Sequence, residues 1–461
     1  MPLLAAFTVP HPPLIVPEVG RGGEKQIEET TKAYERVAAE VASLSPDTIV
    51  ITSPHTVMYA DYFHISPGER AEGSFKRFGA PDVRFAERYD TGLVQKICEL
   101  ADKAGLPAGT LGERDASLDH GTTVPLRFIR RAYTGGKIVR IGLSGLPLAD
   151  HYRLGQIIAK AAAETEKRIV LIASGDLSHK LQSYGPYGFA KEGPEYDRRI
   201  MDVFARAAFG ELLEFDETFC DKAAECGHRS FVIMAGAFDG LRVKPTVLSH
   251  QDITGVGYGV CAFYPGEPDE GRRFLEAFLK KEEEACLRKT EASDPYVRLA
   301  RSSVESWVRL RERLPLPEDL PPEMLTKRAG AFVSIHKNGQ LRGCIGTIAP
   351  TRDSLAEEIV MNAVSACSRD PRFKPIGADE LRFLEISVDV LGEPEDIASP
   401  DELDVKRYGV IVSCGHRRGL LLPDLEGVDT AEEQLSIARR KGGIGEHEPY
   451  TLQRFEVVRH R

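Results

Sequence analysis

The sequence predicts two domains, an α/β N-terminal domain with a layered, mixed sheet and a smaller α+β domain. Three observations support this. Apolar strand-like runs alternate with helical patterns over residues 1–265. A turn cluster and a run of Lys and Glu follow over 266–293, which indicates a charged connector. From 294 to 461 the order of elements changes to paired strands mixed with helices.

The elements of the first domain are predicted from apolar periodicity. Buried strands are predicted at 3–9, 48–52, 137–143 and 168–173, where short apolar runs rich in β-branched residues occur. Helices are predicted at 24–44, 93–104, 124–132, 154–166, 195–208 and 227–238. Strands at 242–248 and 257–263 close the domain.

The second domain begins at a capped helix start, where Asp294 is followed by Pro295. Strands are then predicted at 331–336, 341–345, 383–391, 409–412 and 419–422, with helices at 354–366 and 430–440. This mixture is typical of an α+β domain.

Composition excludes several classes of protein. The chain has 461 residues with 60 Lys+Arg, 70 Asp+Glu and a net charge of −10, which argues against nucleic acid as a partner. No apolar run reaches the ~18 residues of a membrane span, and the N-terminus has the pattern of a strand, not of a signal peptide. Eight cysteines without a CxxC pair predict neither disulfides nor a zinc ribbon. We therefore expect a cytoplasmic protein without a membrane partner.

Chemically useful side chains follow the predicted strands of the first domain. His11 follows the first strand, His55 the second, and His179 lies in a Gly-Asp-Leu-Ser-His turn after the fourth. Glu225 precedes a helix start. Active sites of α/β folds lie at the carboxyl ends of strands. Two histidines and a carboxylate form the facial triad that binds Fe(II), and a spare histidine suits acid–base work.

Several assignments stay open at this level. Glu225 and Cys226 are adjacent, so spacing alone does not choose between a carboxylate and a thiolate as third ligand. Two histidines and a carboxylate also suit zinc. Further candidates for the same pocket lie in the turn before His179 and at the start of the next helix: Asp176, Ser178, His228 and Arg229.

Residues 1–265 resemble the class III extradiol ring-cleavage dioxygenases and the related Memo family. The resemblance rests on Pro10-His11-Pro12-Pro13, Ser53-Pro54-His55, Leu118-Asp119-His120-Gly121-Thr122, Gly175-Asp176-Leu177-Ser178-His179 and the helix start at Glu225. It implies that His11, His55 and Glu225 bind Fe(II), that His179 is the catalytic acid–base group and that His120 lines the pocket. The Memo pattern has Cys-Gly at the last turn, which would make Cys226 the ligand instead.

The resemblance also implies an activity. A dioxygenase of this kind is a non-haem iron oxidoreductase that uses O₂ to open a catechol-like aromatic ring next to its diol. The alternative is a Memo-like module that binds a metal or a partner protein.

Residues 294–461 resemble the AMMECR domain family. The resemblance rests on Leu341-Arg342-Gly343-Cys344-Ile345-Gly346-Thr347 and Ser368-Arg369-Asp370-Pro371-Arg372-Phe373. The fused pair looks like the AmmeMemoRadiSam system, which implies a radical-SAM protein as partner. From the residues alone, Cys344 is either a nucleophile or a small core residue, and Arg342, Arg369 and Arg372 either bind an anion or form salt bridges.

Overall fold

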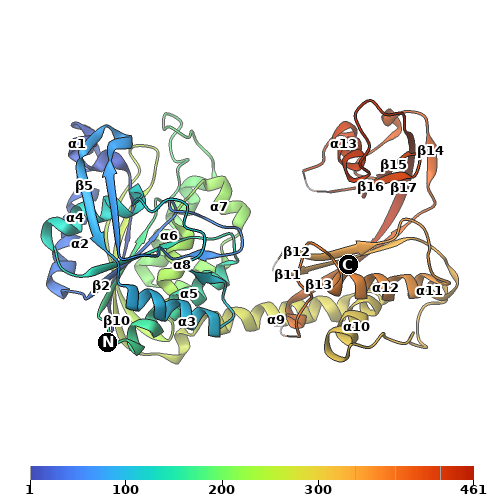
Figure 1. Ribbon diagram of the computed structural model, residues 1–461, viewed down its shortest axis with the longest axis horizontal. Helices are drawn as coiled ribbons and strands as arrows, with labels where there is room; N and C mark the ends of the chain where they lie inside the picture. Colours follow the sequence, from blue (N-terminus) through green and yellow to red (C-terminus); the bar gives the residue numbers. More distant parts are fainter. Residues whose placement is uncertain (1, 338, 379, 426) are drawn as a thin grey trace. The chain divides into compact units, whose positions relative to one another are not determined.

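The computed structural model describes residues 2–337, 339–378, 380–425 and 427–461, the side chains of residues 290 and 291 excepted. Two compact units make up the chain, residues 1–279 and 280–461 (Figure 1). The segment expected to connect them, 266–293, contains the end of strand β10 (Tyr258–Pro268) and helix α9 (Phe274–Ala292). The turn cluster thus overlaps the end of a strand, and the charged run is helical as its composition indicates.

A six-stranded mixed sheet is the centre of the first unit. Its strands are β1 (Leu3–Val9), β2 (Thr48–Ser53), β7 (Lys137–Gly142), β8 (Ile169–Ser174), β9 (Leu241–Gln251) and β10. Their order is β7-β2-β8-β1-β10-β9. The first four strands are parallel to one another, and β10 runs antiparallel to its two neighbours, β1 and β9. This arrangement confirms the predicted α/β class with a mixed sheet.

Helices cover both faces of this sheet. They are α1 (Pro17–Gly20), α2 (Glu28–Leu44), α3 (Thr91–Lys103), α4 (His120–Ala132), α5 (Leu148–Glu164), α6 (Glu192–Arg206), α7 (Glu217–Ala223) and α8 (His228–Gly236). Side chains alternate along a strand, so Val170 and Ile172 of β8 pack on the side of α2 and α4, whereas Leu171 packs on the side of α5 and α8. Burial on both faces explains why the central strands are continuously apolar in the sequence.

Two short sheets in the first unit have no strong signal in the sequence. One is a hairpin of β4 (Arg70–Phe75) and β5 (Ala80–Arg88), and the other pairs β3 (Phe63–His64) with β6 (Ala108–Gly109). The hairpin strands are largely exposed and polar, so they lack the apolar run of a buried strand. This hairpin lies over the cavity beside the site described below.

Helices α5 and α8 approach closely because both carry glycine at the contact. A Cβ added to Gly155 would lie 1.9 Å from the carbonyl oxygen of Ile233, which is too close for any real contact. We expect Gly155→Ala to destabilise the first unit by about 3 kcal/mol, measured by urea unfolding, because the helices must move apart. Gly23→Ala is the control, since nothing approaches its added Cβ closer than 4.0 Å. Equal stability of the two variants would contradict this packing.

The second unit is built on a seven-stranded antiparallel sheet. Its strands are β11 (Ala331–Lys337), β12 (Gln340–Gly346), β13 (Leu384–Leu391), β14 (Glu395–Ile397), β15 (Tyr408–Cys414), β16 (Arg417–Leu421) and β17 (Thr451–His460). The order is β12-β11-β13-β17-β15-β16, with β14 beside β17. The helices are α10 (Pro295–Leu310), α11 (Pro322–Thr326), α12 (Leu355–Ser368) and α13 (Ala431–Lys441). This confirms the α+β prediction.

The sheet of the second unit has two apolar cores under helices and a small third cluster around Ile411 and Phe455. Helices α10 and α12 pack on β11 and β13 around Val333 and Ile335, while α13 packs on β15 and β16 around Val410 and Val412. Phe332 and Ser334 of β11 point away from the first core, since side chains alternate along the strand. They line a cavity between the two parts of this sheet.

Candidate metal centre

The predicted site residues of the first unit come together at one edge of the parallel strands. β1, β2 and β8 run in the same direction, so the residues after their carboxyl ends meet there. His11 follows β1, His55 follows β2, and the turn from Gly175 to His179 follows β8. Cys226 reaches the same point from the loop that precedes α8.

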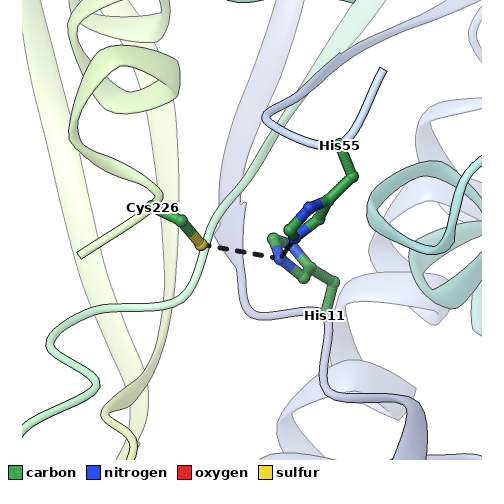
Figure 2. A group of neighbouring side chains, drawn as sticks. All are labelled: His11, His55 and Cys226. Carbon is green, nitrogen blue, oxygen red and sulfur yellow. Dashed lines mark hydrogen bonds between the residues drawn. The ribbon is translucent and has the colours of Figure 1, made fainter. Parts of the chain in front are cut away.

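Two histidines and one thiol form a compact group of potential ligands (Figure 2). His11 Nε2 lies 2.8 Å from His55 Nε2 and 3.6 Å from Cys226 Sγ. All three atoms lie within 4.8 Å of one another. His11 is 1% exposed, Cys226 is half-buried, and His55 reaches the surface of a cavity.

Glu225, the third ligand chosen from the sequence, does not lie in this group. Its carboxylate accepts a hydrogen bond from the backbone N–H of His228, at 2.5 Å, where helix α8 begins. The free N–H groups of a helix N-terminus attract a carboxylate, and the adjacent Cys226 side chain leaves the chain in another direction. We therefore replace Glu225 by the alternative, Cys226, as the candidate third ligand. Spacing in the sequence could not distinguish two neighbours.

A contact between two glycines holds the Cys226 loop against the turn after β8. A Cβ on Gly175 would lie 2.1 Å from the Cα of Gly227. Because neither residue has a side chain, Gly227 N–H donates to the carbonyl of Asp176 at 3.1 Å, and Asp176 N–H donates to Cys226 Sγ at 3.3 Å. This contact sets the thiol opposite the histidines.

Ser174, which the sequence analysis did not select, fixes the tautomer of His11. The Ser174 hydroxyl donates its only proton to the carbonyl of Gly121 at 2.6 Å, so its oxygen accepts from His11 Nδ1 at 2.9 Å. The ring proton of His11 is thereby held on Nδ1. Nε2 is left with a free lone pair that faces His55 and Cys226, as a metal ligand requires.

Replacing Ser174 tests this positioning role. We expect Ser174→Ala to lower the affinity of the first unit for Fe(II) about 10–100-fold, because His11 Nδ1 loses its acceptor and the ring can turn. The measurement is an anaerobic titration against a competing chelator. Ser303→Ala is the matched control, a buried serine of α10 whose hydroxyl binds only its own helix. Unchanged affinity in Ser174→Ala would contradict the assignment.

The surroundings of the group keep its two imidazoles uncharged. Burial lowers the pKa of His11 well below its usual value, and the nearby His55 and His120 lower it further. Burial also lowers the pKa of His55, to about 4, with a further contribution from His120. At neutral pH both rings are therefore uncharged and present lone pairs. Two imidazoles and one thiol fit a transition metal such as iron, zinc or copper, so the donor set present here suits the metal that the fold implies.

Asp176 and His179 form a second polar pair beside the same thiol. His179 Nε2 lies 3.8 Å from an Asp176 carboxylate oxygen, and both side chains group with Cys226 within 4.8 Å. Burial raises the pKa of Asp176 to about 7 and lowers that of His179 to about 4. Such opposite shifts are typical of groups that exchange a proton. Tyr187, which is 58% exposed, stacks on the His179 ring at 5.0 Å between centroids.

His120 lies at the mouth of the cavity beside the centre. It is the first residue of α4, and its ring stacks on that of His55 at 3.9 Å. The cavity has a volume of about 1030 Å³ and extends from these two histidines under the β4–β5 hairpin. Asp119 caps α4 and accepts from the hydroxyl of Ser53 at 2.5 Å, which connects the two histidine-bearing segments.

Three other candidates from the first domain have structural roles. Ser178 is buried and donates to the carbonyl of Ala223. His228 is buried and bonds to the carbonyl of Leu212, and Arg229 pairs with Glu217 on α7. The sequence leaves open whether His228 and Arg229 reach the pocket or lie on a solvated helix face, and in the structure they contact Leu212 and Glu217.

Of the four candidates in the second domain, two line a cavity of that domain and two do not. Arg342 is paired with Glu380 at 2.9 Å, and Arg369 is exposed at the end of α12. Cys344 and Arg372 lie together at the cavity between the two parts of the sheet, where the Arg372 guanidinium donates to the carbonyl of Cys344.

The buried titratable groups predict that the metal-free first unit loses stability in acid. Burial lowers the pKa of His151 to about 3 and those of His179 and His228 to about 4, so the unfolded chain binds more protons between pH 6.5 and 4. Asp176 and Glu225, each raised to about 7 by burial, and Asp197, whose pKa burial also raises, act in the opposite direction. The histidines still outnumber them, because the pKa values of His11, His55 and His120 are lowered as well. We expect a lower urea midpoint at pH 5 than at pH 7. A midpoint unchanged or higher at pH 5 would contradict this balance.

Among the described residues, no helix is long and apolar enough to cross a membrane.

The fold and the clustered side chains define the first unit as an α/β domain with a candidate metal centre. Residues 5–261 match the family model described as "Catalytic LigB subunit of aromatic ring-opening dioxygenase", and residues 297–460 match the AMMECR1 model. The chain belongs to this LigB family and carries a C-terminal AMMECR1 domain. The resemblances of residues 1–265 to the class III extradiol dioxygenases and of residues 294–461 to the AMMECR domain family are thereby confirmed.

One relative matches along the whole chain, and others match only part of it. A protein of Clostridium acetobutylicum is 42% identical over 470 residues, which cover 100% of both chains. A protein of Thermotoga maritima is 50% identical over 169 residues, 36% of this chain and 97% of its own. Among solved structures, an uncharacterized protein of Pyrococcus horikoshii matches 37% of this chain and 91% of its own, with 31% identity and a TM-score of 0.34.

Proposed function

We propose that the first unit is a Memo-like iron-binding domain that holds one Fe(II) ion through Nε2 of His11, Nε2 of His55 and Sγ of Cys226. The observation that carries this proposal is the convergence of these three atoms within 4.8 Å. The free lone pair that Ser174 enforces on His11 supports it as well. Zinc is the competing occupant, because the same donor set suits it.

The surrounding residues prepare the site for a cation. Burial and mutual repulsion keep His11 and His55 uncharged, so no proton has to leave them when a metal binds. The Cys226 thiol does have to lose its proton, and burial together with Asp176 and Glu225 raises its pKa. A bound ferrous ion supplies Lewis acidity and one-electron chemistry. A carboxylate oxygen of Asp176 lies within 4.8 Å of Cys226 Sγ, so this side chain is the nearby group that can take the proton that the thiol releases.

Metal analysis of chain purified without oxygen tests the proposal. We expect about one iron per chain in protein purified in this way, and none in His11→Ala or His55→Ala. Wild-type chain that retains no metal would overturn the proposal. Retention of zinc alone would overturn its choice of iron.

A second candidate function is extradiol cleavage of a catechol-like aromatic with O₂, as the family model's description suggests. Two observations favour it: the Asp176–His179 pair with opposite pKa shifts, and the cavity of about 1030 Å³ that opens at His55 and His120. His179 is placed to take a proton from a bound hydroxyl group, and Tyr187 can cover a flat ring.

Oxygen uptake with a panel of catechols separates the two candidates. Ring cleavage predicts uptake with at least one catechol, and His179→Gln should lower the rate about 10²–10⁴-fold while iron stays bound. An iron-loaded chain that consumes no oxygen with any catechol supports the metal-binding module alone.

We further propose a radical-SAM protein as the partner of the full chain. The support is the fusion of a Memo-like and an AMMECR1 domain in one chain. A pull-down with tagged full chain and a purified radical-SAM protein, carried out without oxygen, is expected to recover a complex. The absence of binding under these conditions would remove this proposal and leave the iron site unaffected.

A further inference from the structure

The second unit contains a cavity of about 1390 Å³, the largest of those described, and it has no part in the metal centre. All its lining residues belong to the second unit. One wall is apolar and is formed by Phe332, Leu422 and Ile437. A volume of this size with mainly apolar walls and a few polar groups is typical of a small-molecule site.

The floor of this cavity carries a polar row across three strands. Ser334 of β11 pairs with Cys344 of β12 on one side and with Ser387 of β13 on the other. All three line the cavity. The Ser334 hydroxyl donates to Cys344 Sγ at 3.2 Å, so the thiol is held in place beside the apolar wall. The opposite face of β11 packs on α10 and α12, which leaves this row free of a covering helix.

Positive charge surrounds the thiol. The Arg372 guanidinium donates to the carbonyl of Cys344 at 3.1 Å and is held by a bidentate pair with the buried carboxylate of Asp370. Lys441, at the end of α13, lines the same cavity, and its charge is close enough to interact with that of Arg372. Among the described residues Lys441 has no carboxylate within ion-pair distance.

A cation that has no ion-pair partner and lies beside an apolar wall suits a ligand with one anionic group and an apolar body. Arg459 and Lys289, also at the cavity, are already paired with Asp389 and Glu385. Arg301 is paired with Glu305, and Arg372 with Asp370. Among the described lining residues, Lys441 and Arg461 therefore remain without an ion pair, and Lys441 is the one beside Arg372. Desolvation lowers the pKa of Lys441, so an anion at this point would restore a favourable environment for its charge.

We propose that this cavity is a second ligand site, which binds a small molecule with an apolar body and one carboxylate or phosphate group, the anion lying between Lys441 and Arg372 beside the Cys344 thiol. The site is independent of the metal centre. Binding therefore has the same affinity in metal-free and iron-loaded chain.

The test uses decanoate, decyl phosphate and neutral decanol as probes on the full chain. Calorimetry is expected to show one binding site for decanoate or decyl phosphate. Whichever of the two probes binds more tightly identifies the preferred anionic group, carboxylate or phosphate. Decanol should bind at least tenfold more weakly, because it lacks the anion. Lys441→Gln should weaken the anionic probe about tenfold. Arg440→Gln, the adjacent exposed cation outside the cavity, should change the affinity less than twofold.

Alkylation of Cys344 locates the binding. The rate of its reaction with iodoacetamide, followed by mass spectrometry, should fall at least fivefold when the anionic probe is bound. Cys98 on α3 of the first unit is the internal control and should react at an unchanged rate. Equal binding of decanol and decanoate overturns the proposal, and so does an unprotected Cys344. Both outcomes are measured on wild-type chain, so they do not depend on how Lys441→Gln folds.

Discussion

Cys226→Ser is expected to lower the affinity of the chain for Fe(II) more than about 100-fold, beyond the range caused by residues that only orient a ligand. A serine hydroxyl does not ionise at neutral pH, so the site loses its anionic donor and keeps only His11 and His55. The measurement is an anaerobic titration against a competing chelator. The effect should shrink as the pH falls, because protons compete with the metal for the Cys226 thiolate of the wild type, whereas His11 and His55 stay uncharged.

Glu225→Gln is the matched control for this prediction. The glutamine amide oxygen can still accept from the N–H of His228, so α8 keeps its N-terminal contact and the loop its shape. Its metal affinity should stay within about threefold of wild type. If Glu225→Gln loses iron and Cys226→Ser retains it, the carboxylate is the ligand and the geometry proposed here is wrong.

Removing the metal is expected to lower the thermal midpoint of the first unit by about 10 °C. A ligand present at 1,000 times its dissociation constant stabilises the folded state by ~4 kcal/mol, and a domain of this size shifts by ~2–4 °C per kcal/mol. The His11→Ala and His55→Ala variants should each have the same thermal midpoint with iron as without it. Circular dichroism measured with and without chelator gives the shift.

The second unit supplies the internal reference for this experiment. The single tryptophan of the chain, Trp307, lies on α10 and packs against the core of the second unit. Its fluorescence transition should not move when iron is removed. If the Trp307 fluorescence transition shifts as much as the transition of the first unit, the metal stabilises a part of the chain outside the proposed centre.

Much of the fold could be predicted because its signals are local. The central strands are continuously apolar since both faces are covered, and the strand-end histidines follow from the strands themselves. The β4–β5 hairpin was missed because its strands are mostly exposed and carry charged residues. Helix α4 begins at His120, before its apolar periodicity, because Asp119 caps it there.

The candidate site was predictable only in part. His11 and His55 could be found because each follows a strand, and parallel strands end at one edge. The choice between Glu225 and Cys226 depends on a helix N-terminus that captures the carboxylate and on a contact between Gly175 and Gly227, which lie 52 positions apart. Neither effect is visible in spacing. Ser174 was overlooked because its role arises only when Gly121 and His11 lie beside it.

X-ray absorption at the iron edge, on the full chain loaded without oxygen, tests the central claim most directly. The ligand set of His11, His55 and Cys226 predicts a sulfur atom bound to iron in wild type and in Glu225→Gln, and its loss in Cys226→Ser. Nitrogen and oxygen neighbours alone in the wild-type spectrum would contradict the assignment of Cys226 as the third ligand.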